Sequence, residues 1–103
     1  MLKAHPEAHP CPGVTRRVLA DSPELMVVSF RFEAGAEGGR HSHPHVQSTY
    51  VRSGRFRFEV ADATFEVDPG DSFVIPRDAP HGCLCLEAGE LIDTFAPRRD
   101  DFL

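Results

Sequence analysis

Three histidines and one glutamine have the residue types and the spacing of metal ligands. In an extended chain, residues two apart point to the same face, and His41, His43 and Gln47 share that parity. His81 lies far downstream and would supply a third imidazole. Together the four side chains would hold one divalent transition metal (Ni, Zn, Fe, Mn or Co) and leave a position for water or substrate. His45 has the same parity, but a proline directly precedes it, so it is the weaker candidate ligand.

The composition describes one small acidic domain. The chain has 103 residues, 41% hydrophobic content and a formal net charge of −5, which fits one domain with a modest core. The negative charge argues against nucleic acid and anionic membranes as partners, but local arginines could still hold a small anionic substrate. The sequence has no bilayer-length apolar run and no apolar signal-peptide segment at its start, so we expect a cytoplasmic protein. The three cysteines, Cys11, Cys83 and Cys85, are expected to be reduced thiols.

Hydrophobic and polar residues alternate with period two along most of the chain. The alternation indicates half-buried antiparallel strands within residues 26–32, 56–60, 65–67 and 91–95. Glycine and other turn-forming residues, among them those at 53–54 and 88–89, predict short turns between strands. Helical periodicity is nearly absent, and only 16–21 could form a helical turn, although a strand fits equally well. We therefore expect an all-β sandwich or small barrel over residues 14–103, preceded by an irregular arm at 1–13.

Two groups of glycine and histidine residues resemble the motifs of the cupin superfamily. The first group is Gly35, His41, His43, Gln47 and Gly54, and the second is Gly70, Pro76, Asp78 and His81. Gln47 stands where the superfamily usually has Glu, and Asp78 stands where it usually has Gly. The resemblance implies a single-domain jelly-roll barrel in which the two histidines and Gln47 lie along one inward strand and His81 faces them. An open barrel of this length leaves an edge strand and an apolar face to cover, so a homodimer is expected.

A narrower resemblance covers residues 14–103 and involves the pectin-degradation proteins of the KdgF type. The matching segments are His-Ser-His-Pro-His-Val-Gln-Ser-Thr-Tyr-Val and the C-terminal run at 80–103. That family opens 4,5-unsaturated monouronates from pectin or alginate breakdown to the linear keto form. Its pattern Asp-x-Phe-x-Pro-x-Arg maps onto Asp93, Phe95 and Arg99. The resemblance implies that Asp93 moves a proton, Phe95 packs on the sugar ring and Arg99 holds the substrate carboxylate.

The residues themselves leave alternatives open. Asp93 shares a strand face with Phe95 and should point inward, where a carboxylate without a partner is costly, so a structural ion pair is the other interpretation. Phe95 could be simply a core residue, and Arg99 a solvated residue of the tail. Arg40, beside the first histidine, is a weaker candidate for binding a carboxylate. Two other functions fit the same ligand set: a metal-dependent oxygenase and a non-catalytic sugar-acid-binding module.

Overall fold

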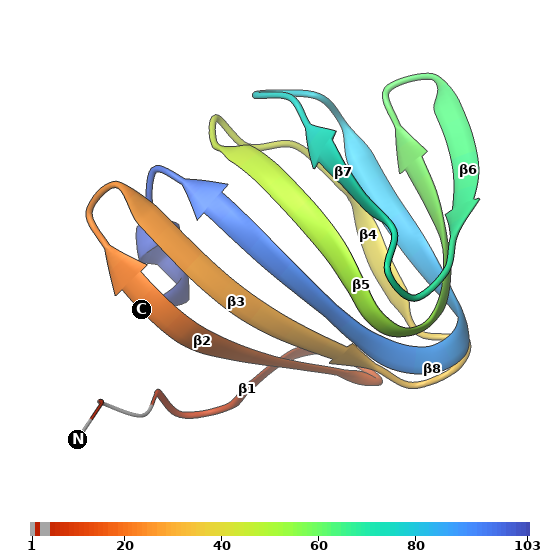
Figure 1. Ribbon diagram of the computed structural model, residues 1–103, viewed down its shortest axis with the longest axis horizontal. Helices are drawn as coiled ribbons and strands as arrows, with labels where there is room; N and C mark the ends of the chain where they lie inside the picture. Colours follow the sequence, from red (N-terminus) through yellow and green to blue (C-terminus); the bar gives the residue numbers. More distant parts are fainter. Residues whose placement is uncertain (1, 3–4) are drawn as a thin grey trace.

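A computed structural model describes residues 2 and 5–103, and most of these residues form β-strands (Figure 1). The strands are β1 (Ala8–Cys11), β2 (Val14–Ser22), β3 (Leu25–Phe32), β4 (Glu37–His41), β5 (Val46–Val60), β6 (Ala63–Val67), β7 (Ser72–Ile75) and β8 (His81–Ala96). A short 3-10 turn, η1 (Asp100–Phe102), follows the last strand. No helix in the described residues has the length and apolar character needed to cross a membrane. The prediction of an all-β fold is confirmed.

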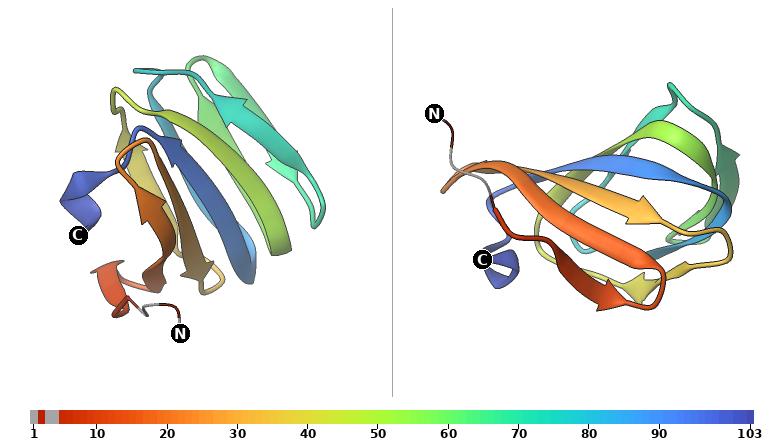
Figure 2. Two further views of the ribbon diagram at one scale, coloured as in Figure 1. Left: turned by 60° about the vertical axis from the view of Figure 1, so that its left-hand side comes forward. Right: turned by 90° about the horizontal axis from the view of Figure 1, so that it is seen from below.

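The strands form one strongly curved antiparallel sheet. Its order is β1-β2-β3-β8-β5-β6, with β4 also paired to β8 and β7 also paired to β5. The sheet is not closed, but the two views in Figure 2 show that it wraps around an interior in the manner of a barrel. The long strands β5 and β8 pair along most of their length and lie at the centre of this arrangement. They carry most of the polar residues that line the interior.

The prediction of turns at 53–54 and 88–89 is wrong, because these residues lie within β5 and β8 at points where the strands bend. The register between the two strands shifts at Ser53 and Arg55, so both strands bend without losing their pairing. Gly54 has a φ of 79°, and a side chain there would collide with the backbone of Glu87 and Gly89. Likewise, a side chain on Gly89 would collide with the backbone of Ser53. Because Gly54 and Gly89 have no side chains, β5 and β8 can approach closely at this bend and stay paired as one curved ladder.

The segment predicted to be an irregular arm is partly a strand. Residues Ala8–Cys11 form β1, which pairs with β2 through Ala8 opposite Arg16 and Cys11 opposite Val14. The prediction of irregular chain is therefore wrong for these four residues. Their His-Pro sequence gave no period-two signal, whereas backbone pairing at a sheet edge needs none. Residues 16–21, for which helix and strand were both open, lie within strand β2.

Two hydrophobic clusters fill the interior. The larger comprises Val14, Phe32, Val51, Phe56, Phe58, Val67, Cys85 and Leu91, and the smaller comprises Val18, Met26, Val28 and Phe95. In the larger cluster the fully buried Phe56 meets the ring of Phe32 edge-on, with 5.3 Å between centroids. Burying a phenyl ring of this kind contributes about 1.5–3 kcal/mol.

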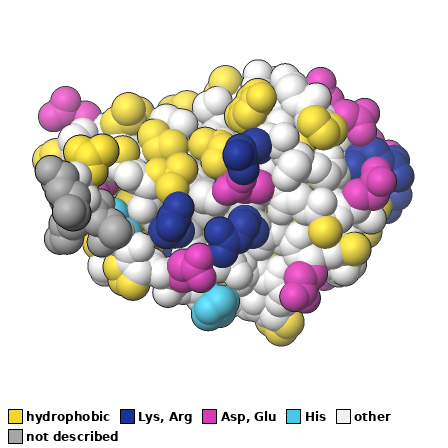
Figure 3. All heavy atoms as spheres, turned by 60° about the horizontal axis from the view of Figure 1, so that its bottom comes forward, with side chains coloured by type: hydrophobic (Ala, Val, Ile, Leu, Met, Phe, Trp, Pro, Cys, Tyr) yellow, Lys and Arg dark blue, Asp and Glu magenta, His cyan; other side chains and the backbone are white. Residues whose placement is uncertain are grey.

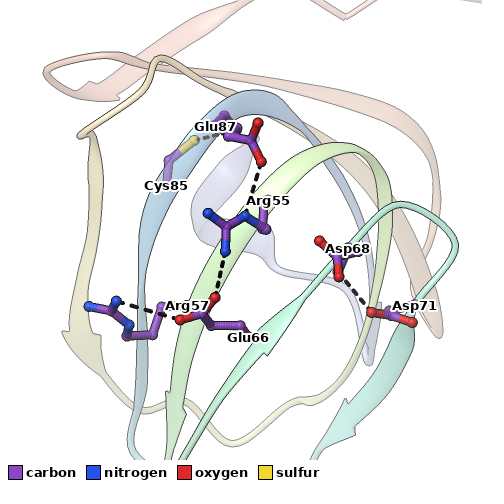
Figure 4. Close-up of polar contacts among 7 residues, drawn as sticks. All are labelled: Arg55, Arg57, Glu66, Asp68, Asp71, Cys85 and Glu87. Carbon is purple, nitrogen blue, oxygen red and sulfur yellow. Dashed lines mark hydrogen bonds and ion pairs between the residues drawn. The ribbon is translucent and has the colours of Figure 1, made fainter.

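Outside the larger cluster, charged residues of neighbouring strands pair with one another (Figure 4). The Arg55 guanidinium on β5 lies 2.7 Å from Glu66 on β6 and 3.0 Å from Glu87 on β8. Arg57 lies 3.6 Å from the other oxygen of Glu66. Figure 3 shows that acidic side chains lie beside basic ones on the face that it draws. Because these pairs are exposed to solvent, each contributes no more than about 1 kcal/mol.

Candidate metal centre

Three strands and one connecting segment bring the predicted ligands together. His41 is the last residue of β4 and lies opposite His81, the first residue of β8. His43 follows in the link before β5, and Gln47 is the second residue of β5. One candidate ligand nitrogen from each histidine lies within 4.8 Å of the others. The implied placement of His41, His43 and Gln47 on one strand is wrong, because the chain bends between β4 and β5.

The backbone holds each of the three imidazoles in the same way. The Nδ1 atom of His41 lies 2.7 Å from the carbonyl oxygen of Gly39, and Nδ1 of His81 lies 2.9 Å from that of Ala79. In His43, Nδ1 lies 3.1 Å from the carbonyl oxygen of His45. A ring that donates from Nδ1 to a carbonyl carries its lone pair on Nε2. The three contacts therefore orient Nε2 as the ligand atom, the arrangement found in protein metal sites.

Two buried groups in this cluster have unsatisfied polar atoms that suit a cation. His81 Nε2 is buried and has no hydrogen-bond partner among the described residues. His43 Nε2 lies 3.0 Å from Oε1 of Gln47, whose amide nitrogen donates to Thr49. A neutral imidazole has one N–H, yet both ring nitrogens of His43 face an oxygen, so one of these contacts lacks a proton. A cation close to Nε2 would satisfy His43, His81 and the amide oxygen together.

Burial keeps these histidines in the state that binds metal. It lowers the pKa of His81 to about 4, against which its hydrogen bond to the Ala79 carbonyl acts only in part. It also lowers the pKa of His43, while the Gln47 contact acts in the opposite direction. Both rings are therefore neutral near pH 7, as metal ligation requires. The three histidines form a cluster that can bind a metal ion.

His45 does not join the cluster. Its ring lies 5.4 Å from that of His43, centroid to centroid, and its nitrogens are not among the clustered ligand atoms. Instead, its backbone carbonyl accepts the hydrogen bond that orients His43. Arg40 is also held away from a substrate role, since it pairs with Glu59 at 3.2 Å and donates to the Ala61 carbonyl.

Asp93 is a buried carboxyl group in the middle of β8. It lies opposite Val28 on one side and Thr49 on the other, and its Oδ1 has no hydrogen-bond partner among the described residues. Burial raises the pKa of Asp93 to about 7, against the opposing effects of Thr49, Gln47 and Arg99. The ion-pair interpretation does not hold in the described residues, because no arginine or lysine lies within ion-pair distance of Asp93. A carboxyl group that is neither paired nor firmly ionised can exchange protons at neutral pH.

Phe95 and Arg99 lie close to the histidines. The ring of Phe95 is 2% exposed and packs edge-on against His43, with 5.6 Å between centroids. Arg99 lies over Phe95 at 5.2 Å and over Phe102 at 4.2 Å. Its guanidinium donates from two nitrogens to the two carboxylate oxygens of Asp101, at 3.0 and 2.8 Å. Phe95 is therefore both a core residue and part of the wall of the site. Arg99 is held in place by its two hydrogen bonds to Asp101.

A cavity of about 230 Å³ is lined by most of these groups, though not by His43. Among its lining residues are His41, Gln47, His81, Asp93, Phe95 and Arg99, all six named from the sequence. Sequence reasoning missed Arg16 and Phe102, which also line the cavity. Arg16 could have been noticed, because it interrupts the apolar alternation of Val14 and Val18. Cys83 lines the cavity as well, but burial raises the pKa of its thiol to about 12 and keeps it protonated.

Comparison with known proteins assigns this architecture to a family. The cupin domain model matches residues 28–94, which include the histidines, Gln47 and Asp93. The chain therefore belongs to the cupin family, and its fold is the cupin jelly roll. An RmlC-like cupin from Shewanella frigidimarina superimposes with a TM-score of 0.92 at 39% identity, over 96% of this chain and 89% of that protein.

Within the cupins, the chain is similar to proteins named KdgF. It is 38% identical to the pectin degradation protein KdgF of Dickeya dadantii over 93 residues, which cover 88% of this chain and 84% of that protein. The structure of KdgF from Halomonas sp. superimposes with a TM-score of 0.89 at 40% identity, over 96% of this chain and 92% of that one. The resemblance stated from the sequence motifs is confirmed.

Proposed function

We propose that this protein is a metal-dependent enzyme that converts 4,5-unsaturated monouronates, released from pectin or alginate, to their linear keto form. The main support is that one small cavity is lined by two histidines of the cluster, His41 and His81, together with a buried carboxyl group whose Oδ1 has no partner among the described residues. Similarity to proteins named for pectin degradation supports the same choice. At about 230 Å³, the cavity is smaller than the roughly 300–1,000 Å³ of pockets for larger ligands, and it suits a single sugar unit.

The metal would be one divalent transition ion, and Ni, Zn, Fe, Mn and Co all suit a nitrogen-rich site. His41, His43 and His81 would hold it through Nε2, and Gln47 would add its amide oxygen. Bound there, the ion would supply Lewis acidity toward an oxygen of the sugar. Because Gln47 is neutral where most cupins have a carboxylate, the site would keep more of the positive charge of the ion.

The proposed reaction is an isomerisation, in which atoms and electrons balance without an oxidant. The C1 hydroxyl loses its proton, the bond from C1 to the ring oxygen breaks, and C4 gains a proton as C5 becomes a ketone. Asp93 lines the cavity, and its Oδ1 has no hydrogen-bond partner among the described residues. Asp93 would move this proton between the C1 hydroxyl oxygen and C4. Phe95 would pack against the ring of the sugar, and Arg99 would bind its carboxylate with N–H donors that Asp101 leaves free.

The direct test follows the loss of ultraviolet absorbance of the conjugated C4=C5 bond in an unsaturated monouronate. The account predicts that metal-loaded protein accelerates the loss above the spontaneous rate, and that a chelator removes the acceleration. Consumption of oxygen during the reaction would favour an oxygenase instead. No acceleration by fully metal-loaded protein would contradict the proposed function.

A homodimer and a cytoplasmic location are part of the same proposal. Light scattering of the purified protein tests the first, with twice the chain mass of 11.4 kDa as the expected result. Fractionation of the source cells tests the second. A monomer, or recovery outside the cytoplasm, would contradict the corresponding prediction.

A further inference from the structure

Arg16 occupies a position in β2 where a hydrophobic residue would be expected. Its neighbours on the same face, Val14 and Val18, are 4% and 5% exposed, and its partner across the strand pair is Phe30. Arg16 itself is partly buried, whereas Arg17 beside it faces solvent. A charge turned toward the interior is destabilising unless something pairs with it. The position of Arg16 therefore calls for a partner.

The described residues contain no hydrogen-bond or ion-pair partner for the Arg16 side chain. Its guanidinium instead lies 4.1 Å from the ring centroid of Phe102. This cation–π contact leaves the N–H donors, which lie in the plane of the guanidinium, available for hydrogen bonds. Burial lowers the pKa of Arg16; Asp101 opposes this shift, and Arg99 adds to it. However, the carboxylate of Asp101 makes its two hydrogen bonds with Arg99.

Arg16 also lines the cavity that His41, Gln47, His81 and Asp93 line. A series of ring contacts leads from the histidines to it. The ring of His43 lies 5.6 Å from Phe95, Phe95 lies 5.7 Å from Phe102, and Phe102 lies under the guanidinium of Arg16. The lining of the cavity thus combines histidines, the guanidinium of Arg16 with its free N–H donors, and the aromatic rings between them.

We propose that Arg16 binds the anionic group of the ligand that enters this cavity. Five N–H donors in a planar fork match a carboxylate, which they can bind through two parallel hydrogen bonds. Arg99 contributes less than it would alone, because Asp101 already engages two of its nitrogens. If the proposed function holds, the anionic group is the carboxylate of the uronate, which Arg16 binds together with Arg99, and Arg16 adds to the specificity for acid over neutral sugar.

The test compares Arg16→Gln and Arg16→Lys with Arg17→Gln, a matched control that removes the same charge from the outward face of β2. Calorimetry with zinc-loaded protein measures binding of D-galacturonate, a saturated monouronate, and of neutral D-galactose. We expect Arg16→Gln to bind galacturonate about 10- to 100-fold more weakly, the loss typical of a hydrogen-bonded charge pair. Arg16→Lys should lose less, since it keeps the charge but not the fork. Arg17→Gln should bind like the unchanged protein.

The inference is overturned if Arg16→Gln binds galacturonate as tightly as the unchanged protein does. It is also overturned if the unchanged protein does not bind galacturonate. If Arg16→Gln does not fold, Arg16→Lys decides the matter in the same way. Because binding is measured without turnover, the result is separate from the proposed reaction. Protein that binds galacturonate through Arg16 but leaves unsaturated monouronate intact would contradict the proposed function and support the role of Arg16. In active protein, Arg16→Gln should raise KM with little change in kcat.

Discussion

The two parts of the barrel interior differ in how fully their polar groups are satisfied. Around Phe56, the core is apolar, and the charged residues outside it pair with one another across β5, β6 and β8 (Figure 4). Around the histidines, the described residues include three buried side-chain atoms without partners: His45 Nδ1, His81 Nε2 and Asp93 Oδ1. Buried polar groups without partners are destabilising. The part of the barrel that holds the candidate site is therefore less favourable for folding than the part around Phe56.

Loss of a metal ligand should have the largest effect, and it should be confined to the site. We expect His81→Ala to bind metal more than about 100-fold more weakly, since even the removal of groups that only support a ligand has effects of 10–100-fold. Metal analysis after dialysis measures this directly, with Arg55→Ala as a control that should keep its metal. Full metal content in His81→Ala would show that the histidine cluster is not the site.

Loss of an aromatic residue from the apolar part should show the opposite pattern. Phe56 is fully buried, so Phe56→Ala should lower the free energy of unfolding by about 3–5 kcal/mol. Urea denaturation measures the loss. The remaining folded protein should bind metal as tightly as before, and weaker metal binding at full folding would contradict the separation of the two parts.

The stability of metal-free protein should depend on pH through Asp93. Burial raises its pKa to about 7 in the folded state from an ordinary value of 3.8. Between these values the unfolded chain has released the proton while the folded protein keeps it, so stability falls as the pH rises, and the loss is complete above the folded pKa. Asp93→Asn should therefore be more stable than the unchanged protein above pH 7, by up to about 4 kcal/mol.

Thermal unfolding across this pH range checks the prediction. The difference between Asp93→Asn and the unchanged protein should shrink as the pH approaches the ordinary carboxyl pKa of 3.8. A difference that stays constant across this range would mean that folding does not shift the pKa of Asp93, and it would contradict the prediction.

The smallest effect is expected at the exposed ion pairs. Arg55→Ala removes the contacts with Glu66 and Glu87, yet it should lower the free energy of unfolding by less than about 1 kcal/mol. High salt should reduce the difference further. A loss as large as that of Phe56→Ala would show that this charged cluster is structurally essential.

Much of the fold was predictable because the period-two pattern of buried residues extends along the strands. The strands at 26–32 and 91–95 follow it closely. The pattern failed where backbone pairing alone makes a strand, as in β1, and where bends look like turns, as at Gly54. In both places the decisive contact is with a chain segment remote in sequence, which local patterns do not report.

The candidate site was predictable in its residues but not in its arrangement. One cavity is indeed lined by His41, Gln47, His81 and Asp93. However, the bend between β4 and β5 places His41 and Gln47 on different strands. The carbonyl contacts that orient the imidazoles depend on loop conformation. The engagement of Arg99 by Asp101 and the contact of Arg16 with Phe102 depend on where the C-terminal residues pack, which local sequence patterns do not show.

The most direct test of the central claim is the turnover of an unsaturated monouronate by Asp93→Asn, measured together with its metal content. Asn keeps the size of the side chain and cannot exchange a proton. The account predicts unchanged metal content and a turnover rate at least about 100-fold lower, the smaller end of what a general acid or base contributes. Turnover within a few-fold of the unchanged protein, with metal bound, would contradict the role of Asp93 and the mechanism proposed around it.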